Sequence, residues 1–132
     1  MFLISLTKVP GLGYQQIQKL IKYFGSSQTV WEASEKDIIL SGCLNKGICD
    51  KLLKMRGVNN NPDFWAKELT KKNIKVCSIY DEVYPDKLRH IFNPPVLFYY
   101  YGAMIDFSNS IAIVGSGKAT CYGKNVAKRL AG

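Results

Sequence analysis

The sequence has 132 residues, of which 47% are hydrophobic and 21% are charged. This is the composition of a globular chain, and its length leaves room for one medium domain or two small ones. The formal net charge is +8, and the Lys and Arg residues outnumber the Asp and Glu residues both before and after residue 73. Such a charge favours a polyanionic partner, most often nucleic acid, although solubility alone is the simpler alternative.

The four cysteines form no C-x-x-C pair and His90 is the single histidine, so we expect neither a zinc site nor any other metal site. The apolar start Met1–Leu6 has no basic residue before it and is followed at once by Lys8 and Pro10. It is too short for a signal peptide or a spanning helix. We therefore expect a cytoplasmic protein with reduced thiols and no membrane contact.

The first 25 residues predict two helices joined by a tight turn. Residues 2–9 predict a short helix that Pro10 ends, and a second helix ends at Gly25 with apolar residues at helical spacing, namely Ile17, Leu20, Ile21 and Phe24. The intervening Pro-Gly-Leu-Gly is typical of a helix-hairpin-helix. Glycines allow positive φ, and the turn amides with the second helix N-terminus can hold a backbone phosphate. The alternative is an ordinary helical hairpin without a ligand.

This turn is a possible second phosphate site, beside the one predicted for residues 115–120 below. Its residues are Gly11, Leu12, Gly13 and Lys19.

Three more short helices are expected before residue 58. One covers residues 27–33, the next is capped by Ser34 and covers Ile38 to Leu40, and the third is capped by Asn45. The turn Ser-Gly-Cys-Leu before Asn45 is a degenerate copy of Pro-Gly-Leu-Gly. Two such hairpins would pack into one compact unit, so we expect a helical domain over residues 1–60.

The second domain, over residues 61–132, begins after a linker. The stretch 57–62 has the composition of a linker, which places the boundary near Asn59–Pro62. Asp63 is expected to cap a helix that carries Phe64, Trp65 and Leu69, and residues 75–79 predict a strand. Helix followed by strand replaces helix followed by helix at this point of the chain.

Residues 84–101 combine a proline-rich segment with an aromatic strand. Pro85 fits the first turn of a short helix carrying Leu88 and Ile91, and residues 96–101 predict a strand. Its tyrosines are interpreted first as side chains that pack alternately on a half-buried sheet. The alternative is a surface on which nucleic-acid bases stack.

The stretch from Ile111 to Gly123 has the pattern of a phosphate-binding strand, loop and helix start. Residues 111–114 predict a buried, central, parallel strand, and the following helix has its apolar positions at Val126, Ala127, Leu130 and Ala131. Glycines, hydroxyls and a lysine in the loop suit an anion at a helix N-terminus. The candidate DNA- or phosphate-binding residues are Gly115, Ser116, Gly117, Lys118 and Thr120.

This loop lacks the spacing of the known cofactor fingerprints. The third glycine of the dinucleotide motif is missing, and so is the Lys-Ser/Thr pair of the P-loop. No set of nucleophile, base and orienting group is evident, so we expect no cofactor, no catalytic residue and no enzyme. Because no strand returns after the last helix, we expect the sheet to continue beyond Gly132. The predicted fold is α+β: a SAM-like helical module and then a truncated Rossmann-like parallel α/β domain.

Several short motifs occur together in an order that resembles the DNA-processing protein A family (DprA or Smf). They are Pro10-Gly-Leu-Gly13, Phe24-Gly25, Tyr84-Pro85 with Leu88, Asn93-Pro-Pro95 with Leu97 and Gly102, and Ile113-Val-Gly-Ser116 with Tyr122-Gly123. The resemblance extends over nearly the whole chain, and the motifs are specific as a set.

The resemblance implies a protein that binds single-stranded DNA, protects incoming strands in natural transformation and helps to load the RecA recombinase, without catalysis. It also implies that Gly115, Ser116 and Lys118 lie in the DNA pocket. The family pattern has Arg where this chain has Gly117, so Lys118 is the nearest cation and weak DNA binding is expected. The segments used for dimerisation and for RecA would follow Gly132, so this chain is expected to be monomeric and the full-length protein dimeric.

Two other functions remain open at this point. Related Rossmann-like folds include phosphoribohydrolases, so the alternative is a loop that holds a mononucleotide phosphate of an enzyme substrate. The helical module by itself would also suit a protein-interaction adaptor.

Overall fold

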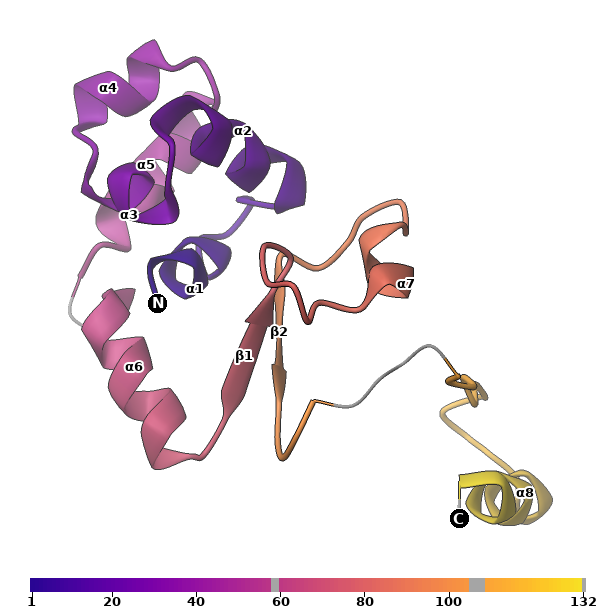
Figure 1. Ribbon diagram of the computed structural model, residues 1–132. Helices are drawn as coiled ribbons and strands as arrows, with labels where there is room; N and C mark the ends of the chain where they lie inside the picture. The colour runs from indigo at the N-terminus through magenta and orange to yellow at the C-terminus, as the bar shows by residue number, and fades with distance from the viewer. Residues whose placement is uncertain (58–59, 105–108, 132) are drawn as a thin grey trace.

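A computed structural model describes residues 1–57, 60–104 and 109–131 of the chain. The order of elements is five helices, a sixth helix, a strand, a one-turn helix, a strand and a last helix (Figure 1). The described part is therefore α+β, as expected. Among the described helices, none has the length and apolar character needed to cross a membrane.

The first five helices form the helical module, which packs around one apolar core. They are α1 (Phe2–Thr7), α2 (Tyr14–Phe24), α3 (Ser27–Glu32), α4 (Glu35–Leu40) and α5 (Lys46–Lys54). Leu6, Ile17, Leu20, Ile38 and Leu52 are completely buried in this core. The helical spacing of the apolar residues in the sequence therefore identified the buried faces correctly.

The predicted helix caps are confirmed in this module, because each capping side chain accepts a hydrogen bond from an amide of the first turn. Ser34 Oγ accepts from Asp37 N at 3.1 Å, and Asn45 Oδ1 accepts from Ile48 N at 2.9 Å. Gly25 ends α2 with φ of +87°. The first helix ends at Thr7 and not at Val9.

Helix α6 (Pro62–Lys71) begins differently from the prediction. Its cap is Asn61, whose Oδ1 accepts from Phe64 N at 2.7 Å, and Pro62 occupies the first turn. The prediction of Asp63 as the cap was wrong, because proline at the first helical position moves the helix start two residues back. Asn59, where the predicted domain boundary begins, lies outside the described residues, and the boundary stays a prediction.

Two strands, β1 (Lys75–Ser78) and β2 (Leu97–Tyr100), pair antiparallel, with Val76 opposite Tyr99 and Cys77 opposite Phe98. The described residues therefore contain an antiparallel pair and not the predicted parallel sheet. Side chains alternate between the two faces. On one face, Phe98 and Tyr100 pack in a cluster with Cys77 and Tyr84, as the first interpretation of the tyrosine run held.

The proline-rich motif between the strands closes this hairpin. The buried Tyr84 donates its hydroxyl hydrogen to Pro95 O at 2.8 Å, and Ile79 N donates to Val96 O at 2.9 Å. The one-turn helix α7 (Asp86–Arg89) starts after Pro85 rather than at it. It ends at Arg89, so Ile91 lies outside the helix, and its side chain is exposed. The Tyr-Pro and Asn-Pro-Pro motifs are thus explained by one connection that holds the two strands together.

The predicted central strand at residues 111–114 is wrong for this structure. Ile111 and Val114 are 91% and 90% exposed, and the segment has no strand pairing. An apolar run becomes a strand only where a neighbouring strand accepts its amides and carbonyls, and none of the described residues does so here. Helix α8 (Cys121–Ala131) forms as predicted, but Leu130 on its expected apolar face is 71% exposed. Figure 1 shows α8 apart from the rest of the molecule.

Candidate nucleic-acid interface

The first candidate site is the loop of residues 115–120 with the first turns of α8. These residues line an open hollow of about 510 Å³ together with Ile113 and Val114. Of the predicted residues, Gly115, Ser116, Lys118 and Thr120 lie at this hollow, and Gly117 lies in the same turn without lining it. The conformation of the loop therefore places four of the five predicted residues at one hollow.

The two hydroxyls of the loop accept hydrogen bonds from the backbone. Ser116 Oγ accepts from Lys118 N at 3.2 Å, and Thr120 Oγ1 accepts from Gly123 N at 3.2 Å. A hydroxyl that accepts still has its own hydrogen to donate. Both side chains can thus fix the loop and at the same time donate to an anion in the hollow.

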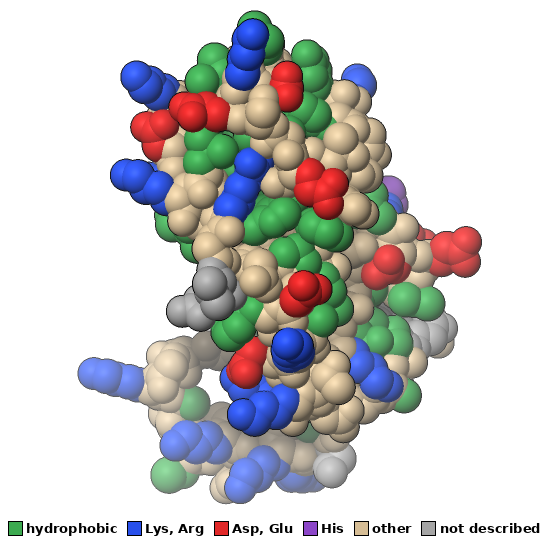
Figure 2. Space-filling view, turned by 90° about the vertical axis from the view of Figure 1, so that its left-hand side faces the viewer, with side chains coloured by type: hydrophobic (Ala, Val, Ile, Leu, Met, Phe, Trp, Pro, Cys, Tyr) green, Lys and Arg blue, Asp and Glu red, His purple; other side chains and the backbone are tan. Residues whose placement is uncertain are grey.

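Lys124 also lines the hollow, one helical turn after Thr120, and the sequence analysis had not named it. Its position could have been found from the sequence, because residues four apart lie on the same face of a helix. In the structure, Lys124 N accordingly donates to Thr120 O at 3.0 Å. Residues 109–131 contain no Asp or Glu, and their cations are Lys118, Lys124, Lys128 and Arg129. In Figure 2 several basic side chains project from the lower, receding part of the surface, where this segment lies. The hollow is therefore electropositive.

The loop glycines are not required by backbone strain or packing. Neither Gly115 nor Gly117 has a positive φ, and a Cβ at either position would have no atom within 4 Å. Because glycine has no side chain, the backbone at both positions is open to a ligand. This close approach is a second reason, besides positive φ, why glycine occurs at anion sites. A larger side chain at 117 would therefore fit.

The second candidate site is the turn between α1 and α2. Gly11 has φ of +88°, and Gly13 precedes α2 in an extended conformation without capping it by a side chain. The amides of the first turn of α2 are thus left to solvent or an anion. The Leu12 side chain is buried in the core and its N–H is bonded to Val9 O at 3.0 Å, whereas Lys19 is exposed farther along α2.

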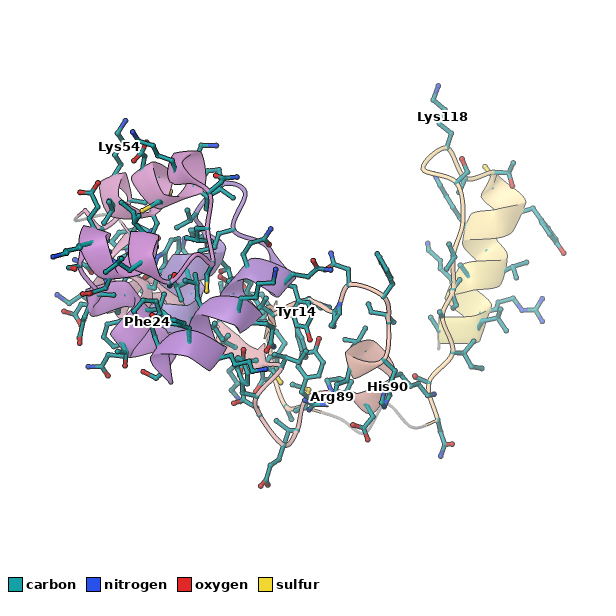
Figure 3. All side chains as sticks on the ribbon, turned by 90° about the horizontal axis from the view of Figure 1, so that it is seen from above. Tyr14, Phe24, Lys54, Arg89, His90 and Lys118 are labelled. Atoms are coloured by element: carbon teal, nitrogen blue, oxygen red, sulfur yellow. The ribbon has the colours of Figure 1, made fainter. Side chains whose placement is uncertain are left out.

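The two sites lie in different parts of the molecule. Figure 3 shows Tyr14 and Lys54 on the helical module and Lys118 on the loop before α8, with Arg89 between the two parts. His90 is exposed at the end of α7, far from the loop in the same view. Within the described ranges, no group of three or more His, Cys, Asp or Glu residues could hold a metal ion.

The fold and the loop define a basic α+β protein with hydroxyls and lysines around a hollow at a helix N-terminus. Residues 75–132 match the family described as DNA recombination-mediator protein A. This match confirms, for that part of the chain, the resemblance to the DNA-processing protein A family that its motifs indicated. No curated protein and no solved structure matches the chain.

Proposed function

We propose that the protein is a DNA-processing protein of recombination or transformation that binds single-stranded DNA at the loop of residues 115–120. The observation that carries this proposal is the electropositive hollow beside Ser116, Lys118 and Lys124, inside the segment that matches the recombination-mediator family. Phosphate oxygens would accept from the loop amides, the hydroxyls and the two ammonium groups.

The family match also supports a finer proposal about the whole protein. Protection of incoming strands and loading of the RecA recombinase are the activities that the resemblance implies. We extend the same proposal to a SAM-like arrangement of residues 1–60 and a Rossmann-like character of the second domain, to a cytoplasmic location and to binding without catalysis. The turn of Gly11 to Gly13 is proposed as a second phosphate contact, because no side chain caps α2.

The test is the salt dependence of oligonucleotide binding by fluorescence anisotropy. The logarithm of the association constant should fall linearly with the logarithm of the salt concentration, with a slope of about 0.7 per phosphate contact for a single strand. Lys118→Ala and Lys124→Ala should each weaken binding and reduce that slope by about 0.7. Equal affinity for single-stranded and double-stranded DNA would argue against the proposed preference.

The matched control is Lys54→Ala. Lys54 is an exposed lysine of α5 in the helical module, so its removal changes the net charge equally at a place remote from the loop (Figure 3). A loss of affinity as large as that of Lys118→Ala would show that binding follows net charge and not the loop. Turnover of a nucleoside monophosphate would instead favour the phosphoribohydrolase alternative.

A further inference from the structure

A groove away from the loop of residues 115–120 combines aromatic rings with a lysine that is not in an ion pair. It has a volume of about 350 Å³ and lies between the end of α1, helix α6 and the hairpin, with Lys8, Phe64, Trp65, Glu68, Lys72 and Tyr99 in its lining. This volume is within the range of small-molecule sites, about 300 to 1,000 Å³. The groove lies on the α6 side of the strands, whereas residues 109–131 lie beyond their other side (Figure 1).

The aromatic rings come from two separate elements. Phe64 and Trp65 on α6 are in edge-to-face contact with centroids 5.2 Å apart, and Tyr99 projects from β2 on the face opposite the Tyr84 cluster. Tyr99 is 40% exposed. Part of its face is thus open to the groove.

The indole of Trp65 is held in place by a chain of two hydrogen bonds, of which the second is buried. Its Nε1–H donates to Asn60 Oδ1 at 2.9 Å, and the Asn60 amide donates to Ser5 O at 3.2 Å. Asn60 is 7% exposed and thereby ties α6 to α1. A ring fixed in this way offers a stacking surface that loses little conformational freedom when a ligand binds.

The charge of the groove is positive. Glu68 is paired with Lys72, with Lys72 Nζ 3.2 Å from Glu68 Oε2. Lys8 Nζ instead lies over two rings, 4.8 Å from the Trp65 centroid and 5.3 Å from the Tyr99 centroid. Among the described residues no carboxylate lies within ion-pair distance of Lys8. The groove thus carries an ammonium group that is held by cation–π contacts and is available to an anion.

We propose that this groove is a second contact for single-stranded nucleic acid, in which one unstacked base lies against Tyr99 and Trp65 while Lys8 moves onto the adjoining phosphate. Stacking faces next to a cation are the recognition chemistry of single strands, because every base has a π-face and every nucleotide carries a charge. The inference rests on the proposed function for the identity of the ligand. Apart from Tyr99, the residues that line the groove lie outside the segment matched by the family.

Tyr99→Ala is the first test, measured as affinity for an oligo-dT strand. Loss of one stacking contact should weaken binding about five- to tenfold, whereas Tyr99→Phe keeps the ring and should bind like the wild type. An abasic strand should bind the wild type more weakly than oligo-dT, and Tyr99→Ala should not weaken it further. Equal affinities of the Ala and Phe variants would overturn the proposal.

Two further measurements keep the test independent of any folding defect in Tyr99→Ala. Lys8→Ala removes a surface ammonium and should lower affinity more than Lys54→Ala, which removes the same charge elsewhere. In a Trp31→Phe background, Trp65 is the single tryptophan and its fluorescence should be quenched by oligo-dT. Quenching by an acidic peptide but not by oligo-dT would overturn the nucleic-acid assignment and indicate a protein partner.

The outcomes separate this inference from the proposed function. If the Lys118 and Lys124 variants lose affinity while the Tyr99 and Lys8 variants do not, the groove proposal is overturned and the loop is supported. The opposite pattern supports the groove and overturns the loop. Absence of any binding by the wild-type chain overturns both.

Discussion

Two side chains, those of Arg56 and Tyr84, hold segments of the chain together by donating to distant backbone carbonyls. Arg56 donates to Ala33 O at 2.7 Å and to Val30 O at 3.2 Å, and its guanidinium lies 6.0 Å from the Trp31 ring centroid. It thereby satisfies carbonyls at the end of α3. Burial lowers the pKa of this guanidinium below its usual range. In the hairpin, the Tyr84 hydroxyl donates in the same way to Pro95 O.

Tyr84→Phe should lower the free energy of unfolding by about 0.5 to 1.5 kcal/mol, because it removes one hydrogen bond and leaves Pro95 O without its donor. The ring still packs against Phe98, with centroids 5.7 Å apart in the wild type. Urea denaturation followed by circular dichroism measures the change. Unchanged stability would mean that water replaces the hydroxyl without cost.

The burial of Tyr84 also predicts that the free energy of unfolding falls at alkaline pH. Burial raises the pKa of Tyr84 above its usual 10.0 and that of Cys77 above its usual 9.0, because the folded state favours the neutral groups. Their contribution is fully present below pH 9 and is lost as the unfolded chain ionises above pH 9 to 10. Urea midpoints should fall across this range, and Tyr84→Phe should make the fall less steep; a flat profile would contradict the prediction.

Gly117→Arg should strengthen binding to single-stranded DNA about three- to fivefold, because it adds a phosphate-binding cation beside Lys118. The position has no positive φ and open space around a Cβ, so the change should not destabilise the loop. Gly57→Arg is the control, since Gly57 is equally open and the added charge is the same. Anisotropy titrations compare the two, and equal gains would exclude a specific role of position 117.

At the scale of elements, the turn between α1 and α2 depends on backbone geometry. Gly11 has φ of +88°, and a Cβ built there would lie 3.6 Å from Ile48 Cγ1, which is an ordinary contact. The requirement for glycine is therefore conformational and not steric. The nearness of Ile48 to Gly11 also shows that the turn lies against the first turn of α5.

Gly11→Ala should destabilise the fold by about 1 to 2 kcal/mol through the left-handed backbone alone. Gly47→Ala is the matched control, because Gly47 lies in α5 without a positive φ and its Cβ would meet only Asn45 Oδ1 at 3.7 Å. That change should stabilise by about 0.5 to 1 kcal/mol. Thermal unfolding of both variants shows whether the two effects have opposite signs.

At the scale of the whole molecule, the helical module and the hairpin share core residues. Val96 from the hairpin side is buried in the core of the helical module, and Tyr14 of α2 packs both there and against the Cys77–Tyr84 cluster. Tyr14 lies between these two parts in Figure 3. Residues 1–57 and 60–104 should thus unfold together, whatever the boundary between domains.

Val96→Ala should lower the stability of both parts, by about 1 to 3 kcal/mol, because it leaves a cavity in the shared core. Trp31 lies in the helical core and Trp65 on α6, so single-tryptophan variants follow the two sides separately. Their denaturation midpoints should coincide and shift together. Two separate transitions would show instead that the parts fold independently.

The sequence by itself determined the local structure of this protein. Apolar spacing, glycine stops and the caps Ser34 and Asn45 depend on neighbours within one or two turns, so the presence of α1 to α5 and of α8 was predicted. The grouping of Ser116, Lys118 and Thr120 was predictable for the same reason. The cap of α6 was missed only because Pro62 outweighed Asp63.

Only the tertiary structure decided the features that depend on distant partners. Residues 111–114 are apolar enough for a strand, yet a strand needs a neighbour for its hydrogen bonds, and the described residues supply none. Pairing of β1 with β2 in antiparallel order likewise depends on the connection that Tyr84 closes. The groove of Lys8, Trp65 and Tyr99 joins residues far apart in the chain, and no local pattern could have placed them together.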